Sequence, residues 1–179
     1  VQGLAKGEKM DSVIRHATEL GVAAFMPLTC ERSIVKLDAK KTRTRLDRWC
    51  SIAKSAAMQS GQPRIPEVLE PRSVKEAAAE LAEATAVLIC WEEAPQTASL
   101  AQAIGRGLSE CFCPRGDARI AVVVGPEGGL TEREVGFFLD ANPRASLVSL
   151  GSSILRTETA GVVAPALTLY ELGKLGGTR

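Results

Sequence analysis

Short, almost wholly apolar segments alternate along this chain with longer segments of helical periodicity, and this alternation restricts the fold more than any other feature. The apolar segments are 22–28, 85–90, 119–125 and 145–151, and the helical segments are 10–20, 42–60, 73–84, 97–110 and one that ends near Leu172. Strands that are apolar on both faces are typical of a parallel sheet covered by helices on both sides. The sequence therefore predicts an α/β fold with a parallel sheet flanked by helices.

The bulk composition favours one domain in the cytoplasm. The chain has 179 residues, of which 45% are hydrophobic and 24% charged, as in ordinary globular domains. No apolar run approaches the roughly 18–20 residues that span a bilayer, and the first residues do not resemble a signal peptide. Five cysteines and one histidine include only one close cysteine pair, Cys111 and Cys113, whose spacing is not that of zinc sites. We expect free, mostly buried thiols, no metal and no membrane segment.

Basic residues are concentrated in the first half of the chain. Residues 1–75 hold 14 Lys and Arg and 8 Asp and Glu, whereas residues 76–179 hold 8 and 13. The densest cluster comprises Lys36, Lys40, Lys41, Arg43, Arg45 and Arg48. Such clustering predicts a surface that contacts the phosphate backbone of a nucleic acid, and a solvated helix entrance is an equally good interpretation.

Glycines, polar residues and charged residues gather in the loops that follow two consecutive predicted strands. The loop GPEGGL follows Val124, and GSSILRTETAG follows Leu150. Ligands of parallel α/β sheets bind at the carboxyl ends of the strands, so the two loops are expected to lie on one edge of the sheet and form one site. The alternative for each loop is a simple tight turn. Thr131 and Glu134 form a capping-box pattern that predicts a helix starting at Thr131.

The glycine loop does not fit phosphate. A phosphate loop of the Walker type needs a lysine after its last glycine, and here Leu130 follows Gly129. The Glu127 carboxylate would repel an anion, and Pro126 removes one backbone N–H. Glycines still allow close approach of bare backbone to an adenine or a ribose. S-adenosylmethionine, which carries a sulfonium and no phosphate, meets these demands.

The last helical segment contains a conflict. Gly161 and Pro165 lie inside it, and an interior proline costs a helix about 3 kcal/mol. Either the regular helix starts close to Pro165 or it is kinked there.

Four motifs together resemble the RsmE family of SPOUT-class methyltransferases, which methylate N3 of a uridine in small-subunit (16S) ribosomal RNA. They occur in the family's order and spacing over essentially the whole chain. The motifs are ELGV (19–22), QSGQ (59–62), VGPEGGLTEREV (124–135) and LGSSILRTETA (150–160). GPEGG alone is weakly specific, but GPEGG followed by LG-x-x-ILRTETA is a specific pair.

The resemblance implies a C-terminal trefoil knot, a bound S-adenosylmethionine and a homodimer. It places the cofactor between the two loops and the strand end near residues 88–90. The implied cofactor-binding residues are Leu88, Gly125, Pro126, Glu127, Gly128, Gly129, Leu150, Gly151, Ser152, Ile154, Leu155, Arg156 and Thr159. Val162, Val163, Ala166, Leu167 and Tyr170 are candidates for the dimer contact, with intrachain core as the alternative.

The implied reaction requires uridine N3 to lose its proton. Arg156 is the candidate cation that stabilises the uracil anion. Glu158 or Glu127 is the candidate base, and either carboxylate has the alternative role of orienting Arg156. For Glu158 a further alternative is a favourable position at a helix N-terminus.

The implied partner is small-subunit ribosomal RNA or the 30S subunit. The candidate RNA-binding residues are Lys36, Lys40, Lys41, Arg43, Gln59 and Arg156. Two departures from the family are visible. The chain starts after the point where the family's N-terminal PUA-like domain would end, so residues 1–179 are expected to be the methyltransferase domain alone. Ser153 stands where the family often has arginine, which keeps open a catalytically weakened RNA-binding or ribosome-assembly module. A nucleotide-phosphate enzyme is disfavoured by Glu127 and Leu130.

Overall fold

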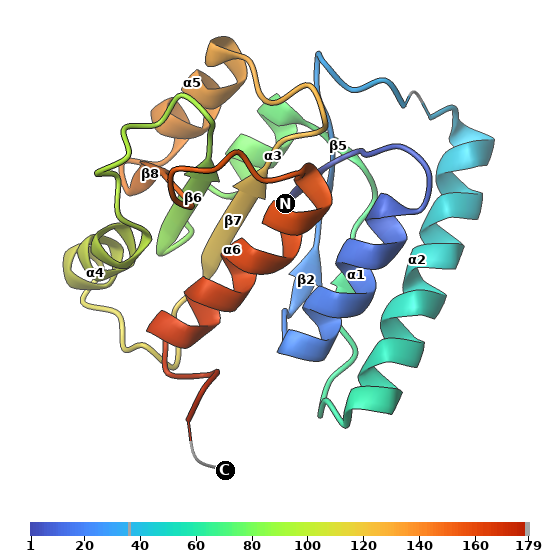
Figure 1. Ribbon diagram of the computed structural model, residues 1–179, viewed down its shortest axis with the longest axis horizontal. Helices are drawn as coiled ribbons and strands as arrows, with labels where there is room; N and C mark the ends of the chain where they lie inside the picture. The colour runs from blue at the N-terminus through green and yellow to red at the C-terminus, as the bar shows by residue number, and fades with distance from the viewer. Residues whose placement is uncertain (36, 178–179) are drawn as a thin grey trace.

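The computed structural model describes residues 1–35 and 37–177, and a six-stranded parallel sheet runs through its centre (Figure 1). The strand order is β5-β3-β1-β7-β6-β8, and neighbouring strands pair in parallel. The strands are β1 (Gln2–Gly3), β3 (Pro27–Thr29), β5 (Arg72–Ser73), β6 (Ala86–Cys90), β7 (Ile120–Val124) and β8 (Ala145–Val148). A second parallel pair joins β2 (Ala24–Phe25) to β4 (Glu67–Val68). The predicted parallel sheet is confirmed.

Helices cover both faces of this sheet because its central strands are apolar on both faces. In β6, Val87 and Ile89 pack with α3 and α5, whereas Ala86 and Leu88 pack with α4. Figure 1 shows α6, α1 and α2 side by side in front of the sheet. The helices are α1 (Lys9–Leu20), α2 (Ala39–Ser60), α3 (Val74–Glu80), α4 (Leu100–Glu110), α5 (Glu132–Ala141) and α6 (Thr157–Glu171).

Local signals in the sequence fix several helix ends. Gly21 ends α1 in the left-handed conformation with a φ of 98°, and the predicted capping box between Thr131 and Glu134 starts α5. The Asp38 side chain accepts the N–H of Lys41, so α2 begins a few residues before the predicted Thr42. These ends agree with the sequence because each is set by contacts within one turn.

Two expectations about local structure are wrong, and one of the two alternatives for the last helix is excluded. Segment 22–28 is split into β2 and β3, which belong to different sheets, because the Met26 carbonyl between them accepts the N–H of Gln2 at 2.9 Å. Helix α6 begins at Thr157 and carries Pro165 inside it, so it does not start near the proline. Of the five cysteine residues only Cys30 is buried as a whole, Cys50 is exposed, and the other three are partly buried.

Candidate functional site

A cleft of about 520 Å³ opens at the carboxyl ends of β7, β6 and β8. The last residues of these strands, Val124, Cys90 and Val148, pair in register and line it. The loops that follow the three strands supply most of the remaining lining. The predicted glycine loop and the predicted loop around Arg156 therefore face one cleft, with the exit of β6 between them.

A second hollow, of about 450 Å³, lies between α1, α6 and the amino-terminal half of β7. Its lining is mostly apolar and includes Val13, Val22, Ile120 and Leu169. Polar groups converge in the cleft at the strand ends, and this convergence is typical of ligand sites in parallel sheets. We therefore take the cleft as the candidate site.

The glycine loop needs its glycines for close backbone packing. A Cβ on Gly125 would lie 3.0 Å from the backbone of Gly129, and a Cβ on Gly3 would overlap Pro126. Gly129 has a φ of 70°, and a Cβ there would overlap the Glu92 carboxylate. The result is a wall of nearly bare backbone toward the cleft.

Gly128 serves the opposite side of the same loop. A Cβ at Gly128 would lie 2.9 Å from the Cβ of Arg32, and Nη1 of Arg32 donates a hydrogen bond to the Gly128 carbonyl at 3.1 Å. This glycine therefore lets the loop after β3 pack against the glycine loop, and it is not part of the cleft lining.

The second wall runs from Ser149 to Arg156 and is largely exposed. The Ser149 hydroxyl accepts the N–H of Gly151 at 3.3 Å, and Gly151 has a φ of 117°. Ile154 is 87% exposed on this wall. Arg156 caps the start of α6, and its exposed side chain forms no ion pair with the residues that the structure describes. The Arg156 guanidinium is therefore available to a ligand.

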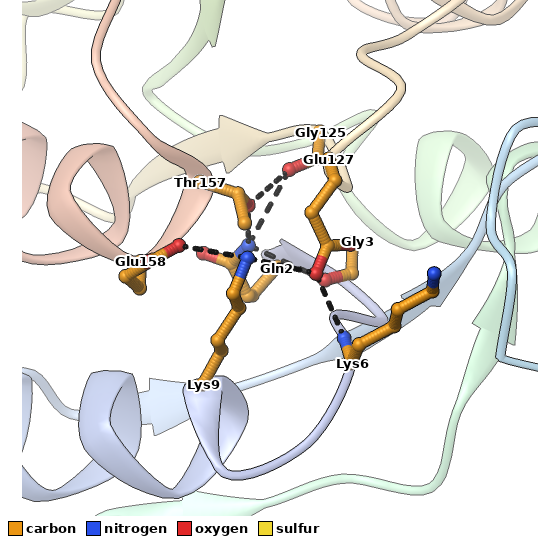
Figure 2. Close-up of polar contacts among 8 residues, drawn as sticks. All are labelled: Gln2, Gly3, Lys6, Lys9, Gly125, Glu127, Thr157 and Glu158. Carbon is orange, nitrogen blue, oxygen red and sulfur yellow. Dashed lines mark hydrogen bonds and ion pairs between the residues drawn. The ribbon is translucent and has the colours of Figure 1, made fainter.

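A buried chain of hydrogen bonds joins the two walls (Figure 2). The Gln2 amide donates to the Thr157 hydroxyl at 2.8 Å, and this hydroxyl donates to the Gly125 carbonyl at 2.6 Å. All three groups are buried, and each hydrogen bond in a buried chain of this kind is costly to lose. Strand β1 thus anchors both the glycine loop and the first turn of α6.

A charged trio lies beside this chain. The Lys9 ammonium lies 3.0 Å from Oε1 of Glu127 and 3.4 Å from Oε2 of Glu158. The same Oε1 accepts the backbone N–H of Lys6 at 2.9 Å. Burial alone would raise the pKa of Glu127, but the hydrogen bonds from Lys6 and Lys9 outweigh it and hold this pKa below its usual value. The hydrogen bond to Glu127 is the main cause that raises the pKa of Lys9.

Several residues of the cleft were not predicted. Trp91 and Glu92 follow β6, and the Trp91 indole N–H donates to the Leu130 carbonyl at 3.3 Å. Lys9 reaches the cleft from the first residue of α1. Burial raises the pKa of the Cys90 thiol to about 12, so the thiol in this cleft stays protonated. The segment WEE directly after an apolar strand was the signal for Trp91 and Glu92, whereas Lys9 had no local signal.

Most of the predicted cofactor residues line the cleft. They are Gly125, Pro126, Glu127, Gly129, Leu150, Gly151, Ser152, Ile154, Leu155 and Arg156, and Ser153 lies among them. Leu88, Gly128 and Thr159 lie outside the lining. Leu88 is fully buried among α4 residues, so its side chain faces away from the cleft. Glu158 is also outside the lining, because its carboxylate is turned toward Lys9.

The predicted RNA-binding residues do not form one surface. Lys40, Lys41 and Arg43 are exposed on the first turns of α2, at the end of α1 that carries Lys9. Gln59 is exposed in the last turn, roughly 28 Å away along the helix axis. Lys36 lies outside the described residues. The structure thus places the basic cluster, but not Gln59, at the end of the helix layer where the cleft opens.

Within residues 1–35 and 37–177, no group of three or more His, Cys, Asp or Glu side chains is arranged to hold a metal ion. In the same ranges no helix combines the length and the apolar character that crossing a membrane requires.

Comparisons with known proteins identify the family. A family model described as the RNA methyltransferase domain matches residues 1–169. The Bacillus subtilis protein named ribosomal RNA small subunit methyltransferase E is 36% identical over 177 residues, which cover 98% of this chain and 66% of that protein. A Mycobacterium bovis protein of the same name is 35% identical, covering 92% of this chain and 59% of that protein.

A solved structure agrees with these relatives. The crystal structure of a ribosomal RNA small subunit methyltransferase E from Neisseria gonorrhoeae bound to S-adenosyl methionine matches with a TM-score of 0.74 at 32% identity, covering 94% of this chain and 63% of that one. The chain thus spans 59% to 66% of the length of these three relatives. The family match and these named relatives confirm the resemblance, and the chain belongs to the RsmE family of RNA methyltransferase domains.

Proposed function

We propose that this chain is an S-adenosylmethionine-dependent methyltransferase that methylates N3 of a uridine in small-subunit (16S) ribosomal RNA. The observation that carries the proposal is the cleft at three strand ends, with bare glycine backbone on one wall and an available arginine on the other. The names of the relatives and the S-adenosyl methionine in the Neisseria gonorrhoeae structure support the same reaction class.

The residues of the cleft fit this cofactor better than a phosphate ligand. Glu92 and Glu127 bring two carboxylates to the lining, which suits a cationic sulfonium. A phosphate would need a free cation in the lining. Lys9 lies there, but its ammonium already contacts the carboxylates of Glu127 and Glu158. The backbone of Gly125, Gly129 and Gly151 would hold the adenosine, because these residues have no side chain of their own and all three line the cleft. Leu88, Gly128 and Thr159 lie outside the cleft lining, so they would affect cofactor binding only by positioning the residues that line it.

The residues of the chain divide the chemistry between them. When bound, S-adenosylmethionine supplies an electrophilic methyl group. Uridine N3 must first release its proton, and Arg156 would stabilise the negative charge that remains on the uracil. Glu127 is a poor proton acceptor because its pKa is lowered and its Oε1 already accepts two donors. Glu158 therefore remains the candidate base, and its carboxylate would have to turn from Lys9 into the cleft to accept the proton of N3.

We also propose the architecture that the family resemblance implies. Residues 1–179 would form one SPOUT-type methyltransferase domain with a C-terminal trefoil knot, acting as a cytoplasmic homodimer on ribosomal RNA or the 30S subunit. The exposed apolar side chains of α6 support the dimer, since Leu167 is 42% exposed and Tyr170 61% exposed. Val162, Val163 and Ala166 are partly exposed on the same helix.

Cofactor titration followed by a transfer assay tests the proposed function. In calorimetry the chain is expected to bind S-adenosylmethionine and to show no binding of ATP. Tritiated methyl groups should then appear in 16S ribosomal RNA of 30S subunits that lack the modification, and nuclease digestion should yield N3-methyluridine. Tight ATP binding would point to a nucleotide-phosphate enzyme. Cofactor binding without transfer would point to the weakened assembly module.

Charge reversal on α2 tests the RNA surface. Replacing Lys40, Lys41 and Arg43 by glutamate should weaken RNA binding and flatten the plot of log affinity against log salt by about 2–3 units, because each lost phosphate contact removes roughly 0.7–0.9. The matched control reverses three exposed charges elsewhere, Lys54, Arg64 and Lys75. An equal salt slope in both triple variants would support the solvated-helix interpretation.

A further inference from the structure

Lys9 is the contact point of both walls of the cleft. Glu127 belongs to the glycine loop and Glu158 to the first turn of α6, and the two carboxylates share the Lys9 ammonium at 3.0 and 3.4 Å. Lys9 itself belongs to neither wall, because it is the first residue of α1 (Figure 2). Its side chain is 30% exposed, so this contact is open to solvent, unlike the buried chain from Gln2 to Gly125.

We propose that Lys9 is a positioning residue that sets the spacing between the glycine loop and the Arg156 loop, and thereby the affinity of the cleft for its cofactor. The part of this proposal that concerns the cofactor rests on the proposed function. The part that concerns the two walls rests on the contacts of Lys9 alone.

The carboxylates need the cation because they lie close together. Both are within 3.4 Å of one nitrogen, and two like charges at such range repel when nothing neutralises them. Glu127 belongs to the glycine loop and is held at 2.9 Å by the Lys6 N–H, and Glu158 lies two residues after Arg156. Removal of the ammonium would therefore leave two like charges, one from each wall, facing each other, and their repulsion would favour a wider spacing of the walls.

Oε2 of Glu158 depends on the Lys9 ammonium for compensation of its charge. This atom is buried and has no hydrogen-bond partner within the described residues, although the Lys9 ammonium lies 3.4 Å away. The attraction of Lys9 is thus what compensates its burial. In a variant without Lys9, acid relieves the repulsion, because a proton on one carboxylate removes its charge.

The charged groups around Lys9 come from every element that packs on it. Glu127 comes from the glycine loop and Glu158 from α6, and Glu92 and Arg156 are the other charged residues of the cleft lining. The carboxylates nearest to Lys9 along its own segment, those of Glu8 and Asp11, form ion pairs with Arg48. In the unsubstituted chain the hydrogen bonds from Lys6 and Lys9 hold the pKa of Glu127 below its usual value, so the Glu127 side of the contact is ionised at neutral pH.

The test compares Lys9→Met, Lys9→Arg and the matched control Lys6→Met. Lys6→Met removes one positive charge from the same segment as Lys9→Met. The Lys6 side chain points away from Lys9, Glu127 and Glu158, and its backbone N–H, which donates to Glu127, is kept in the variant (Figure 2). For Lys9→Met we expect the Kd for S-adenosylmethionine, measured by calorimetry, to rise roughly two- to fivefold at pH 7.5. This deficit should shrink as the pH falls toward about 5, because protonation of one carboxylate relieves the repulsion. Lys9→Arg should restore most of the affinity.

A second measurement does not depend on the cofactor. Hydrogen exchange in the free protein, followed by mass spectrometry, should accelerate in both segments 125–130 and 150–158 of Lys9→Met and in neither segment of Lys6→Met. Equal exchange in the two variants, or a Kd deficit of Lys9→Met that is the same at every pH, would overturn the proposal. Failure of the unsubstituted chain to bind S-adenosylmethionine would overturn the proposed function instead, and the exchange experiment would still decide the role of Lys9.

Discussion

Replacing Arg156 by alanine is expected to reduce methyl transfer to ribosomal RNA by about 10²–10³-fold while the cofactor still binds. The guanidinium lines the cleft, is exposed, and forms no ion pair within residues 1–35 and 37–177, so its charge is free to stabilise the uracil anion. Binding survives because much of the cofactor wall is backbone. The loss should therefore fall on kcat in a transfer assay with saturating cofactor.

Two further variants make the Arg156 experiment decisive. Arg156→Lys keeps the charge but loses the planar fork, so it should recover only part of the activity. Arg133→Ala removes an exposed arginine of α5 whose pair with Glu31 spans 3.7 Å outside the cleft, and it should transfer normally. A normal transfer rate in Arg156→Ala would show that another group stabilises the anion.

The largest loss of stability is expected for Gly161→Val. A Cβ on Gly161 would lie 2.5 Å from Oε1 of Gln2 and 2.9 Å from a methyl group of Val13, so the new side chain must force α6 away from α1 and β1. Overpacking and the loss of the Gln2–Thr157 hydrogen bond together should lower the free energy of unfolding by about 2–4 kcal/mol. Urea unfolding followed by circular dichroism measures this change, and cofactor affinity should fall with it.

Gly136 supplies the control. It lies in α5, and a Cβ there would meet nothing within 4 Å. Gly136→Ala should therefore stabilise the protein by about 0.5–1 kcal/mol, because alanine is the better helix former. A Gly161→Val variant as stable as the unsubstituted chain would mean that the helices have room to separate at no cost.

The parts of the fold that the sequence predicted are those with a strong local pattern. Apolar runs marked β6, β7 and β8, and the Thr131–Glu134 pair marked the start of α5. Strand β1 was missed because it has two residues and therefore no periodicity to detect. The division of segment 22–28 was missed because it depends on the Gln2 N–H, a partner more than 20 residues away in the chain.

The candidate site divides in the same way. The loop of Gly125 and Gly129 could be predicted from its glycines and from the capping pattern that follows it, because the backbone conformation of a loop depends on neighbouring residues. The orientation of Glu158 was not readable, because Lys9 is almost 150 residues earlier in the chain. Gly128 and Gly161 were visible as glycines, but their packing partners, Arg32 and Gln2, are set by the tertiary structure. Sequence patterns indicate which loops bind, whereas long-range contacts decide which atoms face the ligand.

The central place of β1 has a consequence for folding. Gln2 pairs with Val124, which in turn lies in register with Cys90, so the middle of the sheet joins the first residues to strands far along the chain. Contacts of such sequence separation form slowly, because a long loop must close before they contribute. The pair Gln2 and Thr157 requires nearly the whole chain to be present. The cleft is therefore expected to be completed late in folding, and during synthesis it cannot be complete before Thr157 has left the ribosome.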